Sequence, residues 1–459
     1  MKAVLYMVIP CYNEEEVLPY FYQAFCEIAE KLKEYALEVI FVNDGSKDRT
    51  LEIVKGFATE DSRVKYISFS RNFGKEAAMY AGLQHARGEY VAIMDADLQH
   101  PPAMLKEMYE QPKAITDTFA PRIRDGKIVI EELGMTDEEI KAIKKIMIVA
   151  CGSAYHTGVT SKYIFEGLAR IPVEVDVASE FRYRDPILEE GTLVVVISQS
   201  GETADTLAAL RESKKRGAKV LGIVNVVGSS IAREADNVMY TWAGPEIAVA
   251  TTKAYSAQLI ALYLLAMKFG NVRGTVNDTQ LQDMIEDLKA LPAQVEMLLN
   301  NKEKIQRFAN RYLAAKDVFF IGRGIDYAIS MEGSLKLKEI SYIHSEAYAA
   351  GELKHGTISL IEEGTLVASV LTQKDLYKKM ISNMVEVGTR GAFVLAVTCE
   401  DNTEVEKAAD YVVYIPETNK YFTNSLAIIP LQLFGYYIAV GRGCDVDKPR
   451  NLAKSVTVE

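Results

Sequence analysis

The sequence has no excess of basic residues, although it is long and its content of charged residues is typical of a soluble protein. Its 459 residues include 52 lysines and arginines against 63 aspartates and glutamates, which gives a net charge of −11. Nucleic-acid partners require basic surfaces that neutralise phosphates, so this composition argues against nucleic acid as the main partner. The negative net charge does not exclude small anionic ligands, because such ligands are bound by local loops.

Cysteine pairs and long apolar runs are also missing. The five cysteines are scattered, with no CxxC motif and no even framework. Together with the lack of a signal peptide, this pattern predicts a protein of the reducing cytoplasm. No apolar run reaches about 18 residues without polar interruption, so no membrane span is expected. The best candidate, 426–440, contains Pro430 and Gln432, and we predict a buried helix there.

A chain of this length predicts two or three domains rather than one core. Its first part alternates apolar runs with amphipathic stretches. Strands separated by helices indicate a parallel sheet with right-handed crossovers, so the predicted fold class is α/β. The expected strands are 3–9, 37–42, 64–69 and 90–94.

An internal repeat occupies most of the rest of the chain. The sequence GTLV at 191–194 recurs at 364–367, and RGAKVL at 216–221 recurs as RGAFVL at 390–395. The register between the copies holds to within one residue, and each copy has a strand, a helix and a strand in the same order. Two such copies predict two tandem doubly wound domains of similar fold.

These patterns set the expected domain boundaries. Before the repeat, charges dominate, and Thr136 precedes Glu139 at the spacing of a capping box. We therefore expect an extended linker with one helix in that stretch. The expected segments are a first domain at 1–104, the linker and helix at 105–145, the first repeat at 146–277, connecting helices at 278–314, the second repeat at 315–440 and a tail at 441–459.

The strongest local motif is SQSGET at 198–203, which follows a predicted strand at 192–197 and opens a helix. Hydroxyl and backbone N–H groups at the start of a helix form an anion site, and Gly201 lets the backbone approach a ligand closely. Phosphate is the natural ligand, and a plain Ser/Thr helix cap is the alternative. The second copy has LTQKD at 371–375 instead, so the fold does not require the motif, which favours a ligand role.

A second cluster lies in the second repeat, where Lys336 and Glu339 share a helix face. Further charged residues follow at Glu346, Glu352, Lys354 and His355. A lysine, a glutamate and a histidine close together supply an electrophile, a base and an acid. A solvated helix face with salt bridges explains this pattern equally well by itself.

Both motifs resemble a known family. SQSGETADTLAALR, LKLKEISYIHSEAYAAGELKHG and the ending DVDKPRNLAKSVTVE are similar to the isomerase half of the glutamine–fructose-6-phosphate aminotransferases, also called glucosamine-6-phosphate synthases. YEQPKAITDTFAPRI resembles the linker that precedes that half. The resemblance covers residues 104–459 and implies that the two copies are paired sugar-isomerase (SIS) domains.

The resemblance implies roles for individual residues. Glu339 would move a proton between C1 and C2 of fructose 6-phosphate, and Lys336 would stabilise the enolate oxygen. His355, from the neighbouring subunit of a homodimer, would assist ring opening, and Lys454 would form a Schiff base with the C2 carbonyl. The residues implied to bind the phosphate or the sugar are Ser153, Ser198, Gln199, Ser200, Thr203, Val249, Thr251 and Ala453. The tail must then fold over the site, and no cofactor is implied.

The chain departs from the family pattern at three places. Ser153-Ala154 stands where Thr-Ser is common, so one hydroxyl near the sugar is missing, and Thr251 stands where Ser is commoner. Met1 is followed by Lys2 instead of the family's cysteine nucleophile, so no glutaminase domain is expected. Glutamine-dependent amination is therefore not expected from this chain alone.

The first 104 residues resemble a different family. VIPCYNEEEVLP, VNDGSKDRT and the stretch that ends in DADLQHPP are similar to the nucleotide-binding half of GT-A glycosyltransferases of the dolichyl-phosphate mannose synthase group. The resemblance implies nucleotide contacts at Pro10, Glu14, Asp44 and Asp95, with Asp97 holding Mg²⁺ or Mn²⁺. The acceptor half of that family is not recognisable, so we expect a truncated GT-A-like parallel sheet.

Three functions are compatible with these patterns. The first is an isomerase that interconverts fructose 6-phosphate and glucose 6-phosphate, with glucosamine 6-phosphate as a further ligand. The second is a nucleotide-sugar-dependent glycosyltransferase, and the third is a non-catalytic sugar-phosphate-binding protein. The set of Glu339, Lys336, His355 and Lys454 argues against the third, because a binder needs neither a base nor a Schiff-base lysine.

Overall fold

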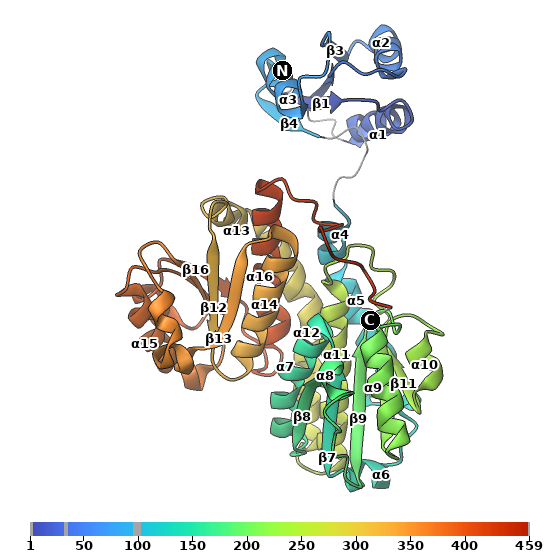
Figure 1. The fold of residues 1–459 in the computed structure, drawn as a ribbon, viewed down its shortest axis with the longest axis vertical. Coiled ribbons are helices and arrows are strands. Elements are labelled where there is room, and N and C mark those ends of the chain that lie inside the picture. Colours follow the sequence, from blue (N-terminus) through green and yellow to red (C-terminus); the bar gives the residue numbers. More distant parts are fainter. Residues whose placement is uncertain (1–2, 32–34, 95–101, 458–459) are drawn as a thin grey trace. The chain divides into compact units, whose positions relative to one another are not determined.

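The structure is a computed structural model that describes residues 3–31, 35–94 and 102–457. The chain divides into two compact units, Met1–Ala103 and Met104–Glu459 (Figure 1). These are called unit 1 and unit 2 below, and each is described by itself.

Unit 1 is a four-stranded parallel sheet with the strand order β3-β2-β1-β4. Successive side chains of β1 point to opposite faces of the sheet. Met7 and Ile9 pack against α1 and α2, whereas Tyr6 and Val8 pack on the side of α3. The predicted strands are confirmed, with ends displaced by one or two residues. The elements are β1 (Ala3–Cys11), α1 (Leu18–Lys31), β2 (Tyr35–Asn43), α2 (Thr50–Glu60), β3 (Val64–Ser68), α3 (Lys75–His85) and β4 (Tyr90–Ile93).

Unit 2 begins with a folded segment where an extended linker with one helix was expected. It contains α4 (Ala103–Tyr109), α5 (Gln111–Phe119), the hairpin β5 (Ile123–Arg124) and β6 (Lys127–Ile128), and α6 (Asp137–Ala142). Met104 and Met108, four residues apart on one face of α4, and Ile115 of α5 are fully buried, and charged neighbours mask these apolar faces in the sequence. The capping box is present, because Thr136 and Glu139 exchange side-chain-to-backbone bonds.

Two five-stranded parallel sheets follow, with the orders β11-β10-β9-β7-β8 and β13-β12-β14-β15-β16. When the strands of each sheet are numbered along the chain, both sheets have the spatial order 2-1-3-4-5. The two predicted doubly wound copies are therefore confirmed (Figure 1, green, and orange to red). The first copy has β7 (Lys145–Ala150), α7 (Gly152–Leu168), β8 (Val173–Val177), α8 (Ala178–Phe181), β9 (Thr192–Ser198), α9 (Ala204–Lys215), β10 (Lys219–Val224), α10 (Ser230–Glu234), β11 (Asn237–Tyr240) and α11 (Lys253–Val272). The second has β12 (Asp317–Gly322), α14 (Ile325–Ser341), β13 (His344–Ala349), β14 (Leu366–Leu371), α15 (Tyr377–Gly388), β15 (Phe393–Cys399), β16 (Tyr411–Ile415) and α16 (Thr423–Gly441).

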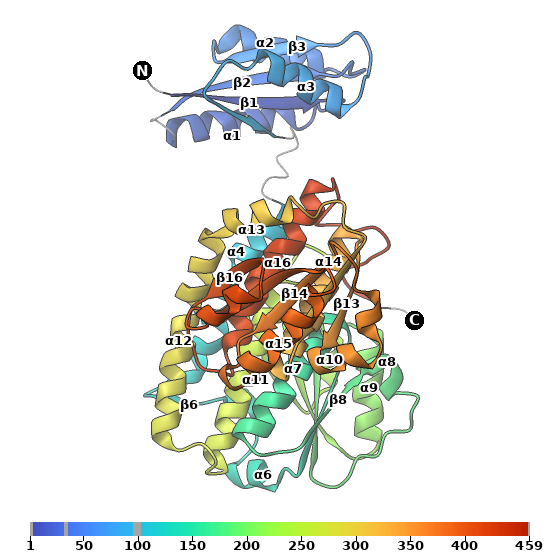
Figure 2. The ribbon, with the colours of Figure 1, turned by 90° about the vertical axis from the view of Figure 1, so that its left-hand side faces the viewer.

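Long helices hold the two copies together. Helix α7 of the first copy packs against α14 of the second, and α12 (Asp278–Asn300) and α13 (Lys302–Ala309) connect the copies and pack on α16 (Figure 2). Among the described residues, α16 alone has the length and apolar composition to cross a membrane, but 89% of its apolar window is buried inside unit 2. The predicted buried helix at 426–440 is therefore confirmed.

Candidate active site

The loop at 198–203 joins the carboxyl end of β9 to the start of α9. The hydroxyls of Ser198 and Thr203 lie 2.9 Å apart, and the N–H of Gly201 donates to the Ser198 hydroxyl at 3.0 Å. Gly201 has a φ of +67°, and a Cβ there would lie 2.0 Å from the Ser229 hydroxyl oxygen. Only glycine fits this position, so the loop shape depends on the residue that the motif supplies.

The carboxyl-terminal tail reaches this loop. The hydroxyls of Ser200 and Ser455 lie 3.1 Å apart, and the N–H of Ala204 donates to the carbonyl of Val456 at 3.0 Å. Ala204 is the first residue of α9, where N–H groups lack partners within the helix. The tail therefore lies directly on the expected phosphate loop.

Lys454 lies in the same tail and contacts the segment before α11. Its Nζ donates to Glu246 and to the carbonyl of Ala248, both at 2.7 Å. The N–H of Val249 donates to the carbonyl of Asp447 at 2.9 Å, so this segment and the tail bond at two places. Val249 and Thr251, expected to line the sugar, belong to this segment, and Ala453 precedes Lys454 in the tail.

Helix α14 carries a buried ion pair. Lys336 is fully buried, and its Nζ lies 2.5 Å from Glu339 and 3.5 Å from Glu332. Burial disfavours the ammonium, but the two carboxylates outweigh it and raise the pKa of Lys336. The Lys336–Glu339 contact lacks hydrogen-bond geometry, and Lys336 Nζ has no hydrogen-bond partner in the described part of the chain. The ammonium is thus charged and able to bond a ligand oxygen.

Glu332 and His156 belong to this cluster, and the sequence reading missed both. Glu332 is fully buried, accepts from the Ser153 hydroxyl at 2.9 Å, and lies 2.8 Å from Nδ1 of His156. Burial alone would raise the pKa of Glu332, but Lys336, His156 and Ser153 together outweigh this effect, so its pKa lies below the ordinary value. The available signal was the spacing, because Glu332 lies one helical turn before Lys336. His156 had no such signal, since its partner is 176 residues away.

The structure thus brings most predicted residues into two connected groups. One joins Ser153 of α7 to Lys336 and Glu339 of α14, and the other joins the loop at 198–203 to Lys454. Glu246 links the groups, because its charge also raises the pKa of Lys336. His355 lies exposed at the end of the 3₁₀ helix η3 (Ala350–His355), outside both groups.

In unit 1, Pro10, Glu14 and Asp44 lie at or just after the carboxyl ends of β1 and β2. Asp44 is buried and accepts the N–H groups of Phe73 and Gly74 at 2.7 and 2.9 Å. Its carboxylate therefore holds a neighbouring loop. Asp95 and Asp97 lie outside the described residues, and among those described no group of three His, Cys, Asp or Glu could hold a metal.

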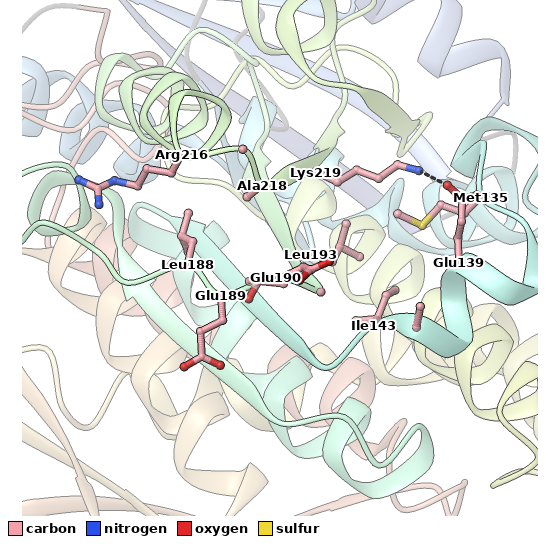
Figure 3. A pocket seen from close by; sticks show the side chains of 14 residues that line it. Met135, Glu139, Ile143, Leu188, Glu189, Glu190, Leu193, Arg216, Ala218 and Lys219 are labelled. Atoms are coloured by element: carbon pink, nitrogen blue, oxygen red, sulfur yellow. Dashed lines mark hydrogen bonds and ion pairs between the residues drawn. The ribbon is translucent and has the colours of Figure 1, made fainter.

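A cavity of about 440 Å³ opens at the amino ends of the first sheet's strands, away from these groups. Figure 3 shows its lining side chains, with Lys219 bonded to Glu139 across it at 3.2 Å. The repeated GTL sequences line this cavity at 191–193 and a second one, of about 720 Å³, at 364–366. Because each copy has a cavity at the equivalent place, we attribute these cavities to the fold shared by the copies and not to a specific ligand site. A different cavity, of about 410 Å³, lies between α7 and α14 beside His156.

Family models match both units. The SIS domain model matches residues 139–268 and 312–441, and the glycosyl transferase family 2 model matches residues 6–148. The chain is 55% identical over 427 residues to the glutamine–fructose-6-phosphate aminotransferase [isomerizing] of Caldanaerobacter subterraneus subsp. tengcongensis, covering 93% of this chain and 67% of the relative. It is 58% identical over 357 residues to the same-named protein of Clostridium acetobutylicum, covering 78% and 59%. The chain therefore spans roughly three fifths to two thirds of these relatives.

Solved structures agree with this match. The C-terminal domain of glucosamine-fructose-6-phosphate aminotransferase from Francisella tularensis is 38% identical with a TM-score of 0.72, covering 76% of this chain and 99% of that domain. A glucosamine-6-phosphate deaminase from Thermotoga maritima is 26% identical with a TM-score of 0.60, covering 77% and 99%. Both are similar to unit 2 in length.

Proposed function

Because the chain belongs to the SIS-domain family and carries a sugar-phosphate isomerase module of the glucosamine-6-phosphate synthase type, we propose that unit 2 binds fructose 6-phosphate and isomerises it. Glucose 6-phosphate and glucosamine 6-phosphate are the expected related ligands. The names of these relatives include both isomerisation and fructose 6-phosphate, which supports this substrate.

The observation that carries the proposal is the position of the tail. Ser455 contacts the phosphate loop at Ser200, and the next residue towards the amino end, Lys454, contacts Glu246. A sugar phosphate held by the hydroxyls and N–H groups of that loop would thus lie next to the amine of Lys454. The same tail bonds the helix N-terminus through Val456.

The chemistry follows from the cluster on α14. A base must remove a proton from C1 while the electrons move onto the C2 oxygen, and the proton must then return at C2. Glu339 takes the role of the base, and the charged Lys336 beside it stabilises the enolate. His355 of a second copy in a homodimer opens the ring, which its exposure permits. Lys454 forms a Schiff base at C2 of the open chain, and water hydrolyses it before the C1 proton is removed, so that the C2 oxygen is present to accept the electrons.

The proposal is limited to the ketose–aldose half-reaction. The residues of this chain that carry roles in the family are those that handle the sugar, and residues 6–148 match the glycosyl transferase family 2 model. A cytoplasmic location fits a phosphorylated sugar substrate and five cysteines that form no disulfide within the described residues.

A second candidate function concerns unit 1. The glycosyl transferase family 2 match favours binding of a nucleotide sugar near Pro10, Glu14 and Asp44, with Mg²⁺ or Mn²⁺ at Asp97. Titration with a UDP-sugar and Mn²⁺, compared between the wild type and Asp44→Asn, tests it. Heat that is unchanged by the substitution, or absent from the wild type, rejects this binding role.

A coupled assay that measures glucose 6-phosphate formed from fructose 6-phosphate tests the main proposal. Glu339→Gln should lower kcat by about 10²–10⁴-fold, the usual contribution of a general base. Glu286→Gln is the matched control, because Glu286 is exposed and, among the residues that the structure describes, forms an ion pair with Lys289 alone. Equal turnover in wild type and Glu339→Gln contradicts the assigned base, and no turnover in the wild type contradicts the function.

A further inference from the structure

Glu246 holds the amino group of Lys454 in a largely buried contact. Its Oε2 lies 2.7 Å from Lys454 Nζ, and its side chain is fully buried, whereas Lys454 keeps 25% of its side chain exposed. The other oxygen, Oε1, accepts the N–H groups of Thr252 and Ala254 at 3.0 and 3.2 Å. These bonds at the start of α11 fix the carboxylate, so Lys454 meets an acceptor that is already in place.

A second carboxyl group, that of Glu107, bonds to the backbone of the segment at 246–248. Glu107 of α4 accepts the N–H groups of Ile247 and Ala248, and its Oε2 has no partner among the described residues. Burial raises the pKa of Glu107 to about 7, with a further rise from the charge of Glu246 and an opposing effect of Lys454. Glu107 therefore carries a proton part of the time near neutral pH.

The charged groups around Lys454 come from three other segments. Glu246 lies before α11, Glu107 belongs to α4, and Lys336 faces Glu246 from α14. The negative charge of Glu246 thus acts on two lysines. Lys336 must stay charged to stabilise an enolate, whereas Lys454 must lose a proton to act as a nucleophile. This arrangement separates the roles of the two amines.

We propose that Glu246 accepts the proton that Lys454 loses before it attacks the sugar carbonyl. The inference rests on the proposed function, since the carbonyl is that of fructose 6-phosphate. An N–H bond of the ammonium breaks and an O–H bond forms at Glu246 Oε2. The nitrogen lone pair then bonds C2, and the carbonyl electrons move to the C2 oxygen.

The remaining steps return the proton. The C2 oxygen receives one proton from the nitrogen and one from Glu246, and it leaves as water. The iminium keeps the third proton of the original ammonium, and Glu246 is ionised again, so atoms and charge balance. When the bound sugar excludes water, proton transfer within the pair also removes two adjacent charges from a poorly solvated site.

An ion pair without proton transfer predicts the opposite effect of removing the carboxylate. If Glu246 only stabilised the ammonium, its loss would release the proton more easily and speed imine formation. If Glu246 accepts the proton, its loss leaves only solvent base and slows imine formation. The sign of the rate change therefore separates the two roles.

The test traps the imine in the full chain with fructose 6-phosphate and sodium cyanoborohydride, and follows the labelled protein by intact mass at several pH values. We expect Glu246→Gln to be labelled at least tenfold more slowly than the wild type at pH 7, with a rate that rises with hydroxide concentration. Glu246→Asp keeps a carboxylate and should retain the shape of the wild-type pH profile at a reduced rate. Glu286→Gln should be labelled like the wild type, and Lys454→Arg should not be labelled.

Each outcome has a definite meaning. Labelling of Glu246→Gln at an equal or higher rate than the wild type overturns the inference while leaving the proposed function intact. A wild type that is not labelled at Lys454 overturns the proposed function. Circular dichroism melting of each variant shows that it is folded, and Glu107→Gln provides a second variant, expected to slow labelling less because Glu107 acts only through the segment at 246–248.

Discussion

The two SIS copies share one strand order, yet the loop after the third strand of each is used differently. In the first copy, this loop presents the hydroxyls of Ser198, Ser200 and Thr203 next to the tail. In the second copy, the N–H and hydroxyl of Thr372 both donate to Asp326, at 2.8 and 2.6 Å. The second loop therefore binds an internal carboxylate where the first is expected to bind a phosphate.

The internal carboxylate has a counterpart in the first copy. Strands β7 and β12 end at Ala150 and Gly322, and Ala154 and Asp326 follow them at the same spacing. The first copy thus has a methyl group where the second has a carboxylate. We therefore expect the side chain at this position, at the start of each copy's first helix, to determine whether the loop binds an anion of the protein or one from solution.

Converting the first copy to the arrangement of the second should have the largest effect. Ala154→Asp places a carboxylate against the loop at 198–203, where it competes with the phosphate for donors and repels its charge. We expect fructose 6-phosphate to bind about 10²–10³-fold more weakly, measured by isothermal titration calorimetry. Ala154→Asn has the same size without the charge and should cost much less, and equal losses in both variants would contradict the comparison.

Removing the charge in the second copy should produce a pH-dependent change in stability. Burial raises the pKa of Asp326 from 3.8 to about 6, although bonds from Thr372 oppose the rise. The protonated carboxyl therefore contributes stability below pH 3.8, and this contribution is lost as the pH rises through about 6. By linkage the loss approaches about 3 kcal/mol.

Asp326→Asn does not titrate, so its stability relative to the wild type should increase by about 2 kcal/mol between pH 4 and pH 7, most of the full linkage effect. Urea unfolding at a series of pH values measures the difference. Asp317→Asn is the matched control, because Asp317 is largely exposed at the other end of β12. A difference between Asp326→Asn and the wild type that is constant with pH would show that Asp326 does not titrate in this range.

Single hydroxyl deletions in the two loops should have the smallest effects, and they should fall on different properties. Thr203→Ala should weaken fructose 6-phosphate binding about tenfold, as expected for one hydrogen bond to a charged group. Thr372→Ala should leave that binding unchanged and lower the free energy of unfolding by about 1–3 kcal/mol, because it leaves Asp326 with one bond fewer. Weaker sugar-phosphate binding in Thr372→Ala would break the distinction between the copies.

Local patterns were sufficient to predict much of this architecture. The strands of both copies are apolar runs, and the repeated GTLV and RGA sequences reveal their common order. The motif at 198–203 could be interpreted because it lies between a strand and a helix. Resemblance to the family supplied the roles of Lys336, Glu339 and Lys454.

Contacts between distant segments could not be predicted in this way. Glu246 and Lys454 are 208 residues apart, and Ser153 and Glu332 are 179 apart, so neither pair leaves a local period in the sequence. Asp326 reads as an ordinary first-turn acid of a helix, and only the fold reveals that it fills the neighbouring loop. The segment at 104–145 was misjudged for a related reason, since its buried face is covered by helices that come much later in the chain.

The residues of the tail that contact the loop at 198–203 and Glu246 are also among the last of the described residues to be synthesised. Lys454, Ser455 and Val456 are synthesised after every strand and helix of both copies, yet they complete the contacts at the loop and at Glu246. A growing chain on the ribosome can therefore assemble its two sheets before Lys454, the lysine proposed to form the Schiff base, has been added. We therefore expect a product that lacks residues 454–456 to form both sheets but to lack the proposed Schiff-base chemistry.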